Sequence, residues 1–261
     1  MKRTMFILVL VLNFLPKINA QDETKVLKAF FDEALTDQTA YENLRYLCKN
    51  YNGRITGSPQ AEAAVEFTFQ LMNDMNLDRV EKQPVQVPRW VRGEDETASI
   101  QSAKFGFKDV PVTALGMSIG TGKNGLSAKV IEVQNFKQLE ELGKENIDGK
   151  IVFFNRAMDP TMINTFGAYG GAADQRTRGA ARAGAFGAVG VLVRSLTTSQ
   201  DDFPHTGVMR YNDTVQQIPA VAISTNGANL LSDWLKNDPD LNFNFRTTSY
   251  ELPEVTSHNV I

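Results

Sequence analysis

Three short apolar runs, separated by helical patterns, constrain the fold of this chain more than any other feature. Residues 151–154, 188–193 and 218–223 are almost continuously apolar, which is typical of strands that are buried on both faces of a sheet. A helix of small residues is expected between the first two runs, at 172–183, and another helical pattern follows the third. Short apolar strands that alternate with helices predict an α/β fold with at least a partly parallel sheet.

The segment before these runs has the pattern of three helices followed by one strand. Amphipathic spacing and alternation predict three helices at 22–35, 39–51 and 60–75 and a strand at 80–87. Ser58 is a suitable N-cap for the third helix, and Pro59 is a suitable first helical residue because its missing N–H costs nothing there. Pro84 suggests that the strand lies at an edge of its sheet.

A change of texture near Gly93 suggests that a self-contained unit is inserted at 93–239, between flanking segments at 21–92 and 240–261. Its further elements are expected as strands at 98–100 and 127–133, a helix at 136–142, and a helix from Ser224 or Asn226 to about Leu235. Asp238-Pro239 is expected to close the unit. Beyond it, strands are predicted at 241–248, which alternates, and from Val255 onwards.

The first twenty residues resemble a secretory leader. Lys2 and Arg3 precede an apolar run of about eleven residues, which is the length of a signal-peptide core and too short to span a bilayer. Pro16 ends the run, and Ala20 supplies a small residue before a cut at Gln21. We expect a secreted or periplasmic protein without a stable membrane anchor; an uncleaved anchor is the alternative.

Charge and cysteine content exclude two classes of protein. The formal net charge of the 261 residues is -3, and the mature part has no basic run, so a nucleic-acid partner is not expected. A single cysteine, Cys48, excludes an internal disulfide framework, and its place on an amphipathic helix predicts a core residue rather than a catalytic thiol.

The chain has few residues of the kinds that a hydrolytic site needs. A hydrolytic metal site needs several His and carboxylate ligands, yet the chain has two histidines, His205 and His258, and no H-E-x-x-H pattern. No G-x-S-x-G nucleophile motif occurs. The sequence therefore predicts no catalytic and no metal-binding residue in this chain. We expect that the chain is truncated and that the metal site lies beyond Ile261.

One loop is the exception. His205 lies in a long polar segment between two strands, and loops of this length often have a function. We treat His205 as a candidate for the substrate entrance, against the plainer interpretation of a surface histidine. The glycine-rich stretch 116–122 lacks the ending of a phosphate loop and is expected to be structural, as are the glycines of 167–190 and His258. Arg178 and Arg182 are expected to share a solvent-facing side of their helix.

Several motifs together resemble secreted zinc exopeptidases of the carboxypeptidase Q and aminopeptidase type. They are Tyr41-Glu42-Asn43-Leu44, Arg54-Ile55-Thr56-Gly57-Ser58-Pro59, Val87-Pro88-Arg89-Trp90-Val91-Arg92-Gly93-Glu94, Leu115-Gly116-Met117-Ser118-Ile119-Gly120-Thr121, Pro204-His205-Thr206-Gly207 and Ile218-Pro219-Ala220. The resemblance covers most of the mature chain in order. It implies that 93–239 is a protease-associated domain inserted into an α/β zinc-peptidase domain.

The same resemblance implies a peptide or dipeptide substrate and two zinc ions, bridged by an aspartate and served by a glutamate base. No residue of this chain matches those ligands, so none is assigned. The resemblance leaves a homodimer open. The alternative function, from another class, is a non-catalytic protease-associated module that binds protein or peptide partners. A third interpretation, a small-molecule α/β enzyme, lacks a nucleophile or phosphate motif.

Overall fold

The computed structural model describes residues 23–94 and 96–261, so the expected leader at 1–20 lies outside the described residues. The chain divides into two compact units, Met1–Asn52 and Gly53–Ile261. In the first unit, α2 spans Glu23–Thr36 and α3 spans Thr39–Asn50, as expected. Asp37 lies between them and accepts hydrogen bonds from the hydroxyl and the N–H of Thr39, which lower the pKa of its carboxyl. Cys48 is exposed, so its prediction as a core residue is wrong.

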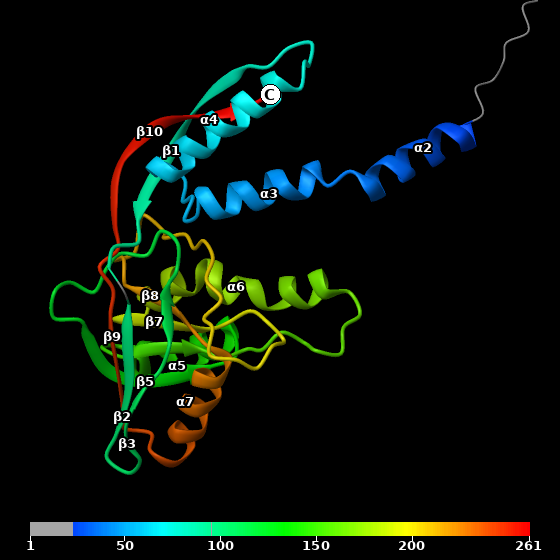
Figure 1. The fold of residues 1–261 in the computed structure, drawn as a ribbon. Helices are drawn as coiled ribbons and strands as arrows, with labels where there is room; N and C mark the ends of the chain where they lie inside the picture. The colour runs from blue at the N-terminus through cyan, green and yellow to red at the C-terminus, as the bar shows by residue number, and fades with distance from the viewer. Residues whose placement is uncertain (1–22, 95) are drawn as a thin grey trace, which may run out of the picture. The chain divides into compact units, whose positions relative to one another are not determined.

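The second unit begins with a helix and a long two-stranded ribbon. Helix α4 spans Pro59–Asp74, and the Ser58 Oγ accepts a hydrogen bond from the Ala61 N–H at 3.1 Å, which confirms the predicted cap. Strand β1, Lys82–Val91, pairs antiparallel with β10, Tyr250–Val260, and the two run side by side in Figure 1. Pro84 lies opposite His258 in this ribbon, and among the described residues β1 pairs with β10 alone, which makes it an edge strand as predicted.

The main body of the second unit is an eight-stranded mixed sheet. Its order is β3-β2-β9-β5-β6-β7-β8-β4. The strands are β2 Thr97–Ser102, β3 Gly106–Asp109, β4 Val112–Ala114, β5 Leu126–Val133, β6 Ile151–Phe154, β7 Gly190–Arg194, β8 Ala220–Ile223 and β9 Asn242–Arg246. Strands β5 to β8 are parallel to one another, and the pairings of β2, β3, β4 and β9 are antiparallel. This confirms an α/β fold with a partly parallel sheet.

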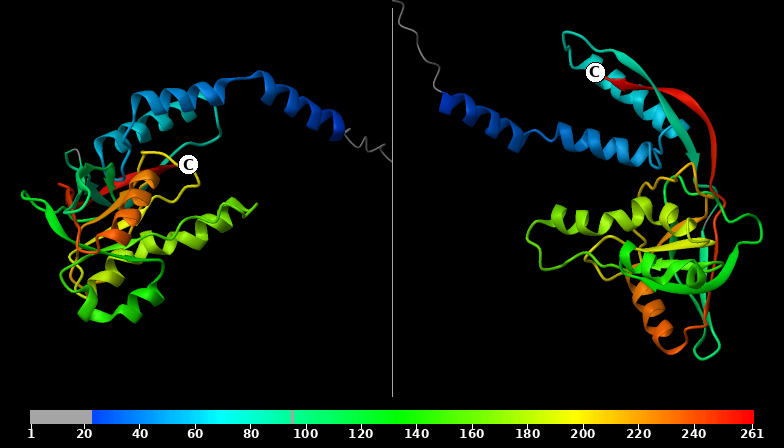
Figure 2. Two further views of the ribbon diagram at one scale, coloured as in Figure 1. Left: turned by 90° about the horizontal axis from the view of Figure 1, so that it is seen from below. Right: turned by 180° about the vertical axis from the view of Figure 1, so that it is seen from behind.

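Helices cover both faces of the sheet (Figures 1 and 2). Helix α7, Thr225–Asn237, packs on one face through Leu231, against Phe153 and Phe243. Helices α5, Phe136–Ile147, and α6, Thr165–Gly184, pack on the other face, where Phe154 belongs to the core. Neighbouring residues of one strand thus serve opposite faces, and all four residues of β6 are buried. Across the described residues, no helix is both long and apolar enough to cross a bilayer.

Three features of the fold differ from the sequence expectation. The sheet does not close at Asp238-Pro239, because β9 lies between β2 and β5, with Phe243 and Phe245 in the core. Strands β3 and β4 were not predicted, because each is very short, and β4 in addition pairs with the distant strand β8. Helix α6 begins at Thr165 rather than at 172, with Asn164 as its cap.

Ser118 joins the ribbon to the sheet. Its carbonyl oxygen accepts hydrogen bonds from Trp90 Nε1 and from Ser249 Oγ, each at 2.8 Å. Its own hydroxyl accepts from the Ala220 N–H, also at 2.8 Å, at the start of β8. Gly93 lies at the same junction with φ +87, and a Cβ there would collide with Thr248 Oγ1. Hydrogen bonds and close packing therefore fix the two segments that connect the ribbon to the sheet, after β1 and before β10.

Candidate functional site

The loop that carries His205 leaves the carboxyl end of β7, where parallel strands commonly present binding residues. It is long but anchored. Ser195 Oγ accepts a hydrogen bond from the His205 N–H at 2.8 Å and donates one to the Ile223 carbonyl at 2.7 Å. Thr206 Oγ1 donates to the Ala114 carbonyl at 2.7 Å, and the Gly116 N–H donates to the Gly207 carbonyl at 2.9 Å. Three hydrogen bonds therefore hold the turn 204–207 in place.

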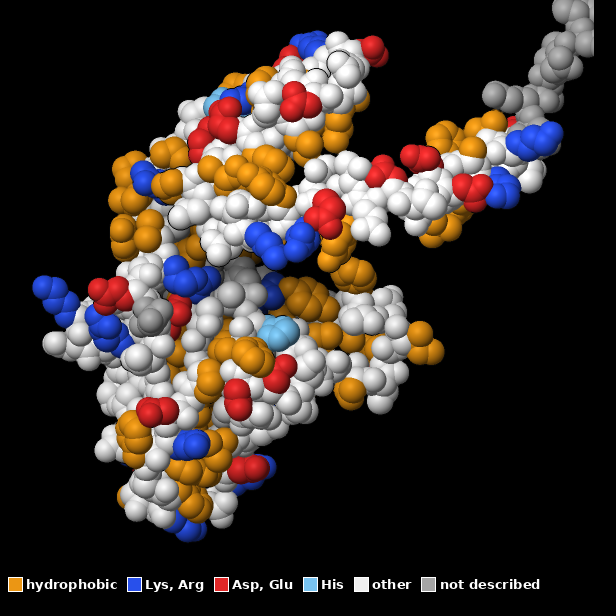
Figure 3. Space-filling model, in the orientation of Figure 1, with side chains coloured by type: hydrophobic (Ala, Val, Ile, Leu, Met, Phe, Trp, Pro, Cys, Tyr) orange, Lys and Arg blue, Asp and Glu red, His pale blue; other side chains and the backbone are white. Residues whose placement is uncertain are grey.

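The His205 side chain itself is exposed. Within the described part of the chain, no hydrogen bond or ion pair engages its imidazole. His258 lies instead on β10, with Nδ1 3.7 Å from Glu62 Oε1, a pair that is ionic only when the imidazole is protonated. Figure 3 shows histidine side chains at two separate places on the surface. The two histidines therefore do not form one site, and His205 is available to contact a ligand.

Arg176 of α6 lies against the same turn. Its guanidinium Cζ is 5.3 Å from the centroid of the Tyr169 ring. A Cβ built on Gly207 would lie 2.7 Å from that Cζ, so the guanidinium packs directly on the Gly207 backbone. Arg176 Nε is buried without a hydrogen-bond partner in the described structure. The sequence analysis did not single out Arg176; the only signal was its place within a glycine-rich helix.

A second polar network lies at the carboxyl ends of the parallel strands. The buried Arg194 donates from Nη1 to Asn229 Oδ1 at 2.8 Å and to Asn155 Oδ1 at 3.2 Å, while Asn155 Nδ2 donates to Glu132 at 2.7 Å. Burial lowers the pKa of Arg194, and the charge of Glu132 opposes that effect. Because Arg194 already has acceptors here, this network serves mainly to tie β5, β6 and β7 to α7.

The glycine-rich stretch 116–122 is structural, as expected. The Ile119 N–H donates to Tyr211 Oη at 3.0 Å, and Tyr211 in turn donates to the Ile218 carbonyl at 2.7 Å. Burial raises the pKa of the Tyr211 hydroxyl. These bonds connect the stretch to the far end of the His205 loop. Arg178 and Arg182 also behave as expected: both are exposed and share one side of α6, over the Phe136 ring.

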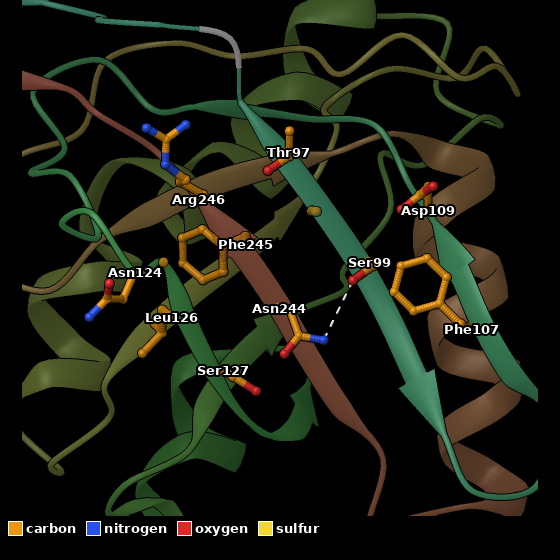
Figure 4. Close-up of a pocket in the computed structure, with 12 residues that line it drawn as sticks. Thr97, Ser99, Phe107, Asp109, Asn124, Leu126, Ser127, Asn244, Phe245 and Arg246 are labelled. Carbon is orange, nitrogen blue, oxygen red and sulfur yellow. Dashed lines mark hydrogen bonds between the residues drawn. The ribbon is translucent and has the colours of Figure 1, made fainter.

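Two hollows lie away from this loop. The larger, of about 310 Å³, lies on the open face of β2, β9 and β5, where Ser99, Asn244 and Ser127 are in register and point outwards (Figure 4). Two charged residues, Asp109 and Arg246, line it, and Arg246 is paired with Glu94 at 3.0 Å. The smaller, of about 230 Å³, adjoins the start of α4. The larger hollow has a mixed lining, in which the hydroxyls and amides of Thr97, Ser99, Asn124, Ser127 and Asn244 lie among apolar side chains.

The described residues do not fit a zinc site. Across residues 23–94 and 96–261, no three His, Cys, Asp or Glu side chains converge as metal ligands would. No chemical step is therefore derived through a metal here. What the described residues can do is bind and orient: a clamped guanidinium and an exposed imidazole lie on or against one anchored turn.

Comparison with known proteins identifies relatives of this chain. No protein-family model matches the chain. It is 31% identical to carboxypeptidase Q of Xenopus laevis over 239 residues, which are 90% of the chain and 48% of that protein. Carboxypeptidase Q of Homo sapiens is 29% identical over 222 residues, 85% of the chain and 44% of that protein.

Solved structures agree with this relation. A peptidase M28 precursor from Shewanella amazonensis, known from its crystal structure, is 35% identical in sequence to this chain. The two superpose with a TM-score of 0.85 over 90% of this chain and 52% of that protein. An aminopeptidase from Aneurinibacillus, at 18% identity and a TM-score of 0.54, shares the fold alone. The chain is thus related over most of its length to carboxypeptidase Q and to an M28 peptidase, and it spans about half the length of each of these relatives.

Proposed function

We propose that this chain forms part of a secreted zinc-dependent metallo-exopeptidase of the carboxypeptidase Q type, which hydrolyses peptides or dipeptides. The observation that carries the proposal is the agreement of sequence and fold along the chain, 31% identity with a carboxypeptidase Q and a TM-score of 0.85 with an M28 peptidase. Bound zinc would supply Lewis-acid chemistry for hydrolysis in such an enzyme. The residues described here contribute binding and orientation.

Within this proposal the two parts of the unit have different roles. We assign the segment 93–239, together with β9, to a protease-associated domain, because its helices and strands bury a core cluster on each face of one sheet. The flanking segments at 21–92 and after β9 belong to the peptidase domain. The ribbon of β1 and β10, with α4 beside it, supports this assignment, because a two-stranded ribbon with one helix buries little apolar surface by itself.

The His205 turn is proposed to shape the substrate entrance. Its backbone is held by Ser195, Ala114 and Gly116, while the imidazole faces solvent. Such an imidazole can position a substrate by one hydrogen bond. It has no neighbouring base in the described structure with which to activate a nucleophile, so its role is orientation rather than bond cleavage.

A peptidase assay on the natural secreted protein tests the proposal. Free dipeptides, N-acetylated dipeptides and C-terminal amides separate carboxypeptidase, aminopeptidase and dipeptidase action, and chelation followed by zinc addition tests the metal requirement. We expect hydrolysis that is lost on chelation and restored by zinc. Saturable peptide binding without hydrolysis under any of these conditions would refute the enzyme and support the alternative, a non-catalytic binding module.

The role of His205 has its own test in the same assay. Losing one orienting hydrogen bond costs about 1–3 kcal/mol, so His205→Ala should lower kcat/KM by roughly ten- to a hundredfold. Asp202→Asn, an exposed change in the same loop, is the control and should leave the kinetics unchanged. Unchanged kinetics in His205→Ala, with the same thermal midpoint as the wild type, would return His205 to an ordinary surface residue.

A further inference from the structure

The Arg176 guanidinium is fixed by two walls that use none of its hydrogen-bonding capacity. One wall is the Tyr169 ring, 5.3 Å from Cζ. The other is the Gly207 backbone, so close that a Cβ there would lie 2.9 Å from both Nε and Nη1. A ring face and a glycine α-carbon hold the flat guanidinium in place through packing and cation–π attraction. Its Nη groups carry N–H donors for which no acceptor is found in the described residues, whereas Nε is buried.

No protein group takes up that capacity in the described residues. Arg156 pairs with Asp174, Arg182 pairs with Glu140 at 3.1 Å, and Arg194 has two amide acceptors. Arg176, although partly buried, forms no ion pair or hydrogen bond with residues 23–94 or 96–261. Its Nε is buried without a partner, as are those of Arg156 and Arg194, but those two arginines have acceptors at Nη. Partial burial of a guanidinium without an acceptor costs free energy, which an anionic ligand would recover.

We propose that Arg176, held against Tyr169 and Gly207 in what we call the clamp, binds the terminal carboxylate of a peptide ligand. The guanidinium has a planar fork of donors that matches the two oxygens of a carboxylate. A single positive charge suits a monoanion, whereas phosphate sites usually gather several cations or a nest of backbone N–H groups. The inference rests on the proposed function only for the statement that the ligand is a peptide.

The position of the clamp on the fold supports this ligand. Gly207 ends the turn 204–207, so the clamp and the exposed His205 lie two residues apart on one anchored segment. Arg176 comes from α6, which Gln175 ties to the end of β6 through the Arg156 backbone, at 2.7 Å to its carbonyl. Both halves of the clamp are therefore held by hydrogen bonds to the sheet. A carboxylate held there would set the register of a peptide along the His205 turn.

Direct binding to the natural protein tests the proposal without hydrolysis. The probes are N-acetyl-alanine, which has a carboxylate but no bond between two amino acids, and its C-terminal amide. Isothermal titration gives the two affinities, and the side-chain N–H resonance of Arg176 reports the contact. We expect the acid to bind at least about tenfold more tightly than the amide. Equal affinities for acid and amide would overturn the proposal.

Three variants separate the clamp from simple charge. Arg176→Gln removes the charge. Gly207→Ala keeps the charge but fills the space that the guanidinium occupies, at a position whose φ is not in the left-handed region. Both should abolish the preference for the acid. Arg178→Gln, two residues along the same helix and stacked over Phe136, is the matched control and should retain the preference.

The possible results distinguish a variant that fails to fold from a clamp that does not bind, and failure of the clamp from failure of the proposed function. If circular dichroism shows that Gly207→Ala does not fold, Arg176→Lys replaces it, because lysine keeps the charge without the fork and should lose most of the preference. A preference retained in either folded variant would refute the clamp. Acid preference without peptidase activity would sink the proposed function and leave this inference intact; activity without acid preference would do the reverse.

Discussion

Replacing Ser118 by alanine tests the junction between ribbon and sheet. Ser118 is 1% exposed, and its hydroxyl accepts a hydrogen bond from the Ala220 N–H, which is fully buried at the start of β8. Alanine removes the acceptor and leaves that N–H unpaired, which costs about 1–3 kcal/mol. The hydroxyl of Tyr211 also loses a hydrogen-bonding neighbour. The carbonyl of residue 118, which holds Trp90, is unaffected by the change.

Urea unfolding followed by tryptophan fluorescence measures the loss. Both tryptophans, Trp90 and Trp234, lie in the unit Gly53–Ile261, so the signal reports that unit. With a urea dependence of about 2 kcal/mol per molar, Ser118→Ala should lower the midpoint by roughly 0.5–1.5 M. Ser127→Ala removes the same hydroxyl from the exposed face of the sheet and should leave the midpoint unchanged. Equal midpoints for the two variants would refute the assigned role of the Ser118 hydroxyl.

Three further predictions concern backbone, pH and folding. Gly93→Ala should lower the thermal midpoint more than Gly106→Ala, because both glycines have positive φ but only the first has atoms where the Cβ would go; equal losses would exclude the collision. Burial raises the pKa of Tyr211, so the stability that this residue contributes is complete below its unfolded pKa of about 10 and is lost as pH rises through the folded pKa. The urea midpoint should therefore fall between roughly pH 9 and 11 less in Tyr211→Phe than in the wild type, and an equal fall would contradict the assignment. A fragment of residues 93–249 should give the near-ultraviolet circular dichroism of a packed core, whereas 93–239 should not, because it lacks β9; a folded shorter fragment would show that β9 is dispensable.

Local sequence patterns predicted the elements whose signals are local. The buried strand β6 was placed at its observed residues, because four apolar side chains in a row serve both faces of the sheet. The start of α4 followed from Ser58 and Pro59, because capping depends on groups within one turn. The α/β class followed from the alternation of such segments.

Long-range pairing was beyond local patterns. The alternation of residues 241–248 correctly indicated a half-buried strand, but a strand pattern carries no record of its partner. It was therefore assigned to the flank, whereas β9 lies between β2 and β5 inside the sheet. Cys48 was misplaced for a related reason: an amphipathic face shows that a helix can bury one side, not which surface covers it.

The sequence by itself determined the fold class, the start of α4 and the one histidine that lies on a long loop. Only the tertiary structure decided which residues of other elements pack against that loop. Arg176 and Gly207 are far apart in the chain, and no local pattern pairs them, yet packing puts the guanidinium on the glycine backbone and against Tyr169. The physical reason is that helix and strand signals arise from neighbouring residues, whereas a binding clamp arises from the burial of distant ones against a shared sheet.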